Sequence, residues 1–116
     1  MLRELELLKR SEVVESYEIL DYKEGSDFYF LKIKARLIDG SVLYVREFVS
    51  SGDYNYSFQW QKDGKLKIRW DNAPHHRELP TFPHHKHVGG ERNVVPSNEI
   101  TLEDVLTFIA NHVQNP

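Results

Sequence analysis

The alternation of apolar and charged residues between Tyr29 and Leu37 constrains the fold of this chain more than any other feature. The odd positions are apolar, and the residues between them include Lys32, Lys34 and Arg36. A period of two predicts a β-strand with one face in the core and the other in solvent. Asp39-Gly40 then favours a tight hairpin into a second strand over Val42 to Val49. The chain therefore contains antiparallel sheet.

Two registers are open for this hairpin. A two-residue loop places Lys32 opposite Glu47 and puts Arg46 on the apolar face beside Tyr44. A three-residue loop places Lys32 opposite Arg46 instead. Like charges that face each other across strands are unfavourable, so we expect the two-residue loop.

A second hairpin is predicted around Asp63-Gly64, between strands over Tyr54 to Trp60 and Leu66 to Asp71. A two-residue loop would oppose Trp60 and Phe58 to charged residues. A three-residue loop with Gly64 in the left-handed region avoids this. We therefore expect the three-residue loop, which pairs Trp60 with Leu66, Phe58 with Ile68 and Tyr56 with Trp70 and keeps all six on one buried face.

Further elements flank these hairpins. Leu2 to Arg10 has apolar residues at helical spacing, and Val13 to Tyr22 is expected to be the first strand. Thr101 and Asp104 form a capping-box-like start for a helix with an apolar face of Leu102, Val105, Leu106, Ile109 and Val113. The predicted class is α+β: a curved antiparallel sheet of about five strands, an N-terminal and a C-terminal helix, and a long histidine-rich loop, in one domain over residues 1–116.

Composition excludes several classes of protein. The chain has no cysteine, which rules out disulfides and thiolate metal sites, and no apolar run approaches the roughly 20 residues that span a bilayer. Its amino terminus lacks the layout of a secretory signal, so a cytoplasmic protein without membrane contact is expected. The net charge of −3 argues against a protein that coats nucleic acid nonspecifically. Between Lys65 and Arg92, however, six basic residues face three acidic ones, which suits an anionic ligand at a local site.

The segment from Asn72 to Glu99 is too long for an ordinary connection in a compact domain. Its prolines and apolar residues favour an ordered loop that wraps back over the sheet. Five of the six histidines lie in it, namely His75, His76, His84, His85 and His87. Such a cluster has two ordinary uses, metal binding and acid–base chemistry, beside the plainer alternative of solvated or carbonyl-bonded rings.

The metal alternative needs three or four converging ligands. His84 with His87, helped by His75 or Asp71, would supply them. Adjacent histidines in an extended chain point to opposite sides, and no HExxH pattern is present, so this alternative is the weaker one.

The acid–base alternative suits cleavage of RNA without a metal or other cofactor. A base takes the proton of the ribose 2′-hydroxyl, an acid protonates the leaving oxygen, and cations stabilise the phosphorus centre. We favour His85 and His87 as this pair, because alternation turns both to one side and Lys86 to the other. Arg69 and Lys86 are the expected phosphate ligands, whereas Trp70 is expected in the core.

Two motifs carry a resemblance to a known family. The run Arg-Trp-Asp-Asn-Ala-Pro-His-His at 69–76 and the run Phe-Pro-His-His-Lys-His at 82–87 resemble the TumE family of small toxins of toxin–antitoxin pairs. This resemblance implies growth arrest that is neutralised by a helix-turn-helix antitoxin encoded beside the toxin. RNA as the substrate is our inference from the residue chemistry, and a homodimer is compatible with the sequence. The alternatives are a non-catalytic binding module and a metal-dependent nuclease.

Overall fold

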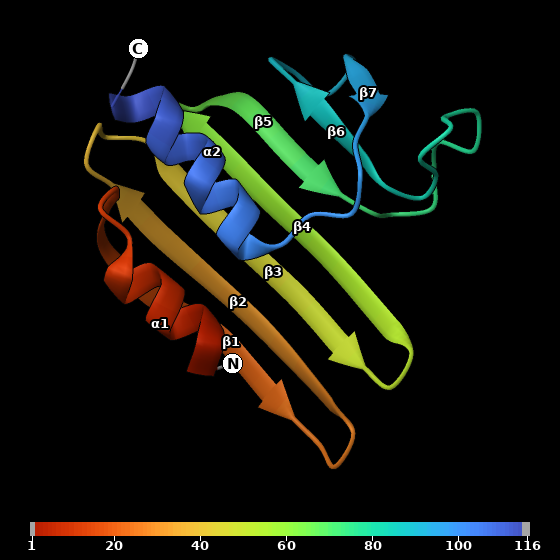
Figure 1. Cartoon of the computed structure of the whole chain (residues 1–116), viewed down its shortest axis with the longest axis horizontal. Helices are drawn as coiled ribbons and strands as arrows, with labels where there is room; N and C mark the ends of the chain where they lie inside the picture. Colours follow the sequence, from red (N-terminus) through yellow and green to blue (C-terminus); the bar gives the residue numbers. More distant parts are fainter. Residues whose placement is uncertain (1, 115–116) are drawn as a thin grey trace.

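Over residues 2–114, which the computed structural model describes, seven strands form one antiparallel sheet and two helices pack on it (Figure 1). Residues 1, 115 and 116 of the expected domain lie outside this range. The elements are α1 (Leu2–Arg10), β1 (Val14–Glu24), β2 (Phe28–Leu37), β3 (Val42–Ser50), β4 (Asp53–Lys62), β5 (Lys65–Asp71), β6 (His85–Val88), β7 (Val94–Pro96) and α2 (Leu102–Gln114).

The sheet follows chain order from β1 to β7, and each strand is antiparallel to the next. The α+β class and the two terminal helices are therefore confirmed, and all five expected strands are present. Two more strands, β6 and β7, lie inside the segment that was expected to be a loop. β6 adds to the edge of β5, with Asp71 paired to His85 and Ile68 to Val88. The number of strands was underestimated because these short strands depend on a distant partner rather than on a local pattern.

The expected register of the first hairpin is wrong. Lys32 lies opposite Arg46, and the loop has three residues. Leu37 N donates a hydrogen bond to Ser41 O at 2.9 Å, and Gly40 in the loop has a φ of 85°. This register buries Leu43 and Val45 completely. Burying one such side chain is worth about 1.5–3 kcal/mol, against a few tenths for an exposed like-charge pair, so burial decides.

The second hairpin also differs from the prediction. Its loop is the two-residue Asp63-Gly64 turn, with φ of 52° and 74°. A β-bulge leaves Lys67 as the extra residue of β5, so that Trp60 pairs with Ile68 and Phe58 with Trp70. The bulge restores the apolar face that the shorter turn would otherwise have broken. The shared buried face is thus confirmed for Tyr56, Phe58, Trp60, Ile68 and Trp70, whereas Leu66 is half-buried.

Both helices pack on the same face of the sheet (Figure 1). The predicted capping box of α2 is present: Asp104 N donates to Thr101 Oγ1 at 3.3 Å, and Thr101 N donates to Asp104 Oδ2 at 3.0 Å. Its buried face consists of Leu102, Val105, Leu106 and Ile109. Neither helix of the described chain is long and apolar enough to cross a membrane. We call the other side of the sheet, which neither helix covers, the open face.

Candidate histidine and aspartate site

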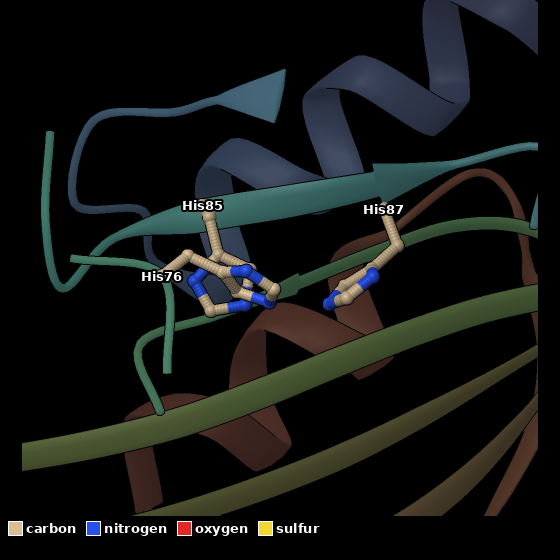
Figure 2. A group of neighbouring side chains, drawn as sticks. All are labelled: His76, His85 and His87. Carbon is tan, nitrogen blue, oxygen red and sulfur yellow. The ribbon is translucent and has the colours of Figure 1, made fainter. Parts of the chain in front are cut away.

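The pairing of β5 with β6 brings four charged or titratable side chains together. Arg69 lies opposite His87, and Asp71 opposite His85. Side chains alternate along a strand, so all four point to the open face, while Lys86 lies opposite Trp70 on the helix side. Figure 2 shows the rings of His85 and His87 on the same side of β6.

Asp71 is the centre of this group. Its Oδ1 lies 3.0 Å from His85 Nε2, and its Oδ2 lies 3.1 Å from Arg69 Nε and 3.6 Å from His87 Nε2. The backbone N–H of Ala73 also donates to Oδ1 at 3.0 Å. The residue is only 6% exposed. A buried carboxylate is stable only with such charged and hydrogen-bonding partners.

Backbone carbonyls orient both rings. His85 Nδ1 lies 3.0 Å from Pro83 O, and His87 Nδ1 lies 2.9 Å from Glu91 O. A carbonyl can only accept, so Nδ1 carries the proton in each ring and Nε2 faces Asp71. Both nitrogens of His85 lie 3.0 Å from an acceptor, Nδ1 from Pro83 O and Nε2 from Asp71 Oδ1. A ring that carries a proton on each nitrogen can donate to both. The separation of 3.6 Å leaves His87 Nε2 outside hydrogen-bond distance and free to accept a proton.

Arg69 connects the group to the surface. Its guanidinium binds Glu91 through two hydrogen bonds, including NH2 to Oε2 at 2.7 Å, in addition to the bond to Asp71. The hydrogen bonds from Arg69 lower the pKa of Glu91 below its usual value. The Glu91 side chain is 63% exposed, against 22% for Arg69. An anion from solvent could therefore compete with Glu91 for this guanidinium.

The remaining histidines divide between two places. His76 joins the buried pair: its ring centroid lies 4.7 Å from that of His85 and 5.8 Å from that of His87 (Figure 2). One ligand atom from each of these three rings lies within 4.8 Å of the others, which is compatible with a shared metal ion. His84 lies apart, with Nδ1 2.8 Å from Tyr56 Oη. The group of converging ligand atoms thus contains His87 but not His84, the partner considered for it in the metal alternative.

The site opens into a cavity of about 580 Å³. His75, which is exposed, lies on its rim together with Pro74. One wall of the cavity consists of the site residues Arg69, Asp71, His76, His85 and His87. The opposite wall comes from the neighbouring strands and consists largely of Phe30, Arg46, Phe48 and Ser57. The site is thus a hollow of the open face rather than an isolated loop.

Comparison with known proteins identifies the family. A protein-family model described as Toxin TumE matches residues 4–113, nearly the whole chain. The chain belongs to the TumE toxin family. The resemblance seen in the two histidine motifs is thereby confirmed, and membership of TumE makes the chain a toxin component that has an antitoxin as its general partner. Searches of curated proteins and of solved structures returned no match.

Two residues of this TumE site were not anticipated from the sequence. Arg46 was assigned to the apolar face by the wrong hairpin register, yet it lines the cavity. Glu91 holds Arg69 through its carboxylate and His87 through its carbonyl. A correct register would have revealed Arg46, whereas no local signal points to Glu91.

Proposed function

We propose that this TumE toxin cleaves RNA with His87 as the general base and His85 as the general acid. The observation that carries the proposal is the convergence of both Nε2 atoms on Asp71, 3.0 and 3.6 Å away, at the wall of an open cavity. Such a toxin would act in the cytoplasm, where its substrate is. No metal or cofactor takes part in this mechanism.

The reaction is an internal transfer at phosphorus. His87 Nε2 takes the proton of the ribose 2′-hydroxyl, and the resulting oxygen forms a bond to phosphorus. As the bond from phosphorus to the 5′-oxygen breaks, the proton on His85 Nε2 passes to that oxygen. The products are a 2′,3′-cyclic phosphate and a 5′-hydroxyl. Asp71 balances the charge of His85 and keeps its ring in place.

Cations are needed for the extra negative charge on phosphorus. Arg69 is one candidate, because phosphate can displace the exposed Glu91 carboxylate from it. Arg46 is the other, since it lines the same cavity. Lys86 was the other expected phosphate ligand. It lies on the side of β6 opposite His85 and His87, as the alternation predicted, and so it is not assigned to this pair of cations.

A second candidate is a metal-dependent nuclease. It is favoured by the His76, His85 and His87 group, whose ligand atoms lie within 4.8 Å of one another. Nδ1–H bonds to backbone carbonyls, as in His85 and His87, are the usual outer support of metal-binding histidines. A divalent ion of the zinc class would then polarise the phosphate in place of proton transfer by these rings.

Neutralisation would follow from the same geometry. We place a segment of the helix-turn-helix antitoxin across the loop from Asp71 to His87, with carboxylates that meet Arg69 and the histidines. A segment in this position would close the cavity and compete with Glu91 for the guanidinium.

The test uses the full chain purified without antitoxin. It is incubated with total RNA and with a supercoiled plasmid, with and without a chelator. RNA cleavage that survives the chelator supports the proposal. Cleavage that the chelator abolishes and zinc or manganese restores supports the metal enzyme. A protein that cleaves neither substrate is a binding module, and the ribonuclease proposal then fails.

A further inference from the structure

The open face carries a group of cations beside the histidine site. Lys32, Lys34 and Arg36 lie on β2 and Arg46 on β3, each between core residues of its strand, so they point away from the helices. Within residues 2–114, none of Lys32, Lys34 and Arg46 forms an ion pair. These charges are therefore available to an anionic ligand.

Two acidic residues of the edge strand β1 also lie on this face, apart from Asp71 of the histidine site. Glu18 and Asp21 of β1 are paired in the ladder with Lys34 and Lys32. Asp21 contacts Lys23 at 3.8 Å, on its own strand. The charge on this face thus changes from negative on β1 to positive on β2 and β3, in the direction of the cavity, although the chain as a whole has a net charge of −3.

Aromatic rings alternate with these cations. The guanidinium of Arg46 lies 5.5 Å from the ring centroid of Phe30, and Lys34 Nζ lies 5.9 Å from that of Tyr44. Phe48 stacks on Phe28 with centroids 5.8 Å apart. Rings interleaved with basic side chains on an uncovered sheet are the arrangement that stacks unpaired bases while cations hold the backbone.

Two of these cations, Lys32 and Arg46, line hollows that adjoin the histidine site. The cavity of the site reaches Phe30, Arg46 and Phe48. A second hollow of about 320 Å³, which includes Lys32 and Tyr44, shares Arg46 and Ser57 with it. The path crosses the sheet from β2 to β6, which is four strand spacings of about 4.8 Å, or roughly 19 Å. A short stretch of an extended polynucleotide fits this length.

We propose that the open face binds single-stranded RNA and leads it from β2 across β3 and β4 to His85 and His87. The inference rests on the proposed function in taking RNA as the substrate. A single strand is specified because duplex bases are already stacked and cannot lie on Phe30, Tyr44 or Phe48. RNA binds to this face alone, because the cations gather here while the chain as a whole has a negative net charge.

The experiment measures binding without cleavage. The probe is a fluorescent single-stranded RNA of mixed sequence with 2′-O-methyl riboses, which cannot form the cyclic product. Anisotropy titrations at several salt concentrations compare the full chain with Lys34→Ala, Arg46→Ala and Phe48→Leu. Each cation removed should lower the slope of log K against log salt by about 0.7. Loss of the ring at position 48 should weaken binding about tenfold.

Matched controls lie outside the face. Lys9→Ala removes an exposed lysine from α1, and Phe82→Leu removes an exposed ring that does not line the cavity. Both variants should bind the probe with the affinity and salt slope of the wild-type chain. The melting temperature of every variant shows whether it is folded. Folded Lys34→Ala and Arg46→Ala proteins with an unchanged salt slope would overturn the inference. So would equal affinity for a duplex, or an acidic antitoxin peptide that binds this face when the RNA probe does not.

The two proposals fail separately. If total RNA is cleaved but the open-face variants bind the probe normally, the RNA track is wrong and the ribonuclease remains. If the probe binds through Lys34 and Arg46 but no RNA is cleaved, the track remains and the catalytic assignment is wrong.

Discussion

His85 Nε2 and Asp71 Oδ1 lie 3.0 Å apart on two strands that pair directly, β6 and β5. The histidine is 2% exposed and the aspartate 6%. Because the second ring nitrogen of His85 is bound to Pro83 O, the ring can neither rotate nor exchange its partner without breaking a buried hydrogen bond. The pair therefore contributes to the structure of the sheet. A substitution that tests catalysis by His85 must keep the hydrogen bond to Pro83 O while it removes the ability to transfer a proton.

Replacement of either buried histidine by asparagine should abolish cleavage. His85→Asn and His87→Asn retain a donor near the Nδ1 position for Pro83 O and Glu91 O, yet neither can transfer a proton. General acid–base catalysis contributes about 10²- to 10⁴-fold, so each variant should lose RNA cleavage by at least about 100-fold and should cease to arrest growth. Initial rates on a defined RNA measure the loss.

The matched control is His112→Asn. His112 also has Nδ1 at 3.0 Å from a carbonyl, that of Phe108, but it lies on α2 away from the cavity. It should keep full activity. Unimpaired cleavage by folded His85→Asn and His87→Asn proteins would show that the two histidines are structural.

Protection by the antitoxin should be detectable by chemical modification. His75 is exposed on the rim of the cavity and His112 is exposed on α2. If the antitoxin covers the loop from Asp71 to His87, diethyl pyrocarbonate should modify His75 several-fold more slowly in the complex, with His112 unchanged. Mass spectrometry of peptides from the free and bound chain measures both rates. Equal labelling of His75 in the two samples would mean that neutralisation occurs elsewhere.

Stability should depend on pH through Glu47. Burial, helped by the nearby Glu4, raises its pKa from 4.5 to about 7, and its Oε1 has no hydrogen-bond partner among the described residues. A carboxyl whose pKa is raised in the folded state favours folding when protonated. Its contribution is therefore complete below about 4.5 and is lost as the pH rises to about 7 and beyond.

Urea unfolding across this pH range tests the effect. The free energy of unfolding should fall with rising pH in the unchanged chain, and Glu47→Gln should flatten that fall. The exposed Glu15→Gln serves as the control and should leave the pH dependence as it is. If Glu47→Gln has the same pH dependence of unfolding free energy as the wild-type chain, groups other than Glu47 cause that dependence.

The buried face of the second hairpin should dominate stability. Phe58 is fully buried and Ile68 is 8% exposed. Alanine at either position leaves a cavity and should cost about 2–5 kcal/mol of unfolding free energy. Gln59 lies between Phe58 and Trp60 on β4 but points to the open face, so Gln59→Ala should change the unfolding free energy by less than about 0.5 kcal/mol. Similar costs for Gln59→Ala and Phe58→Ala would contradict the observed facing of β4.

Local sequence determined the elements whose signals lie within a few residues. Alternation from Tyr29 to Leu37 was sufficient for β2, and Thr101 with Asp104 was sufficient for the start of α2. These signals depend on which face of a single strand or helix is apolar, and on caps that bond within one turn. The family resemblance was equally local, because contiguous motifs carried it.

Only the tertiary structure decided the registers and the composition of the site. Lys32 faces Arg46 because burial of Leu43 and Val45 outweighs a weak repulsion, which depends on what the helices cover. β6 exists because β5 offers unpaired backbone groups at its edge, and that pairing alone places His85 against Asp71. Contacts between distant segments depend on the burial and hydrogen bonding of the whole sheet. A short stretch of sequence does not determine these quantities.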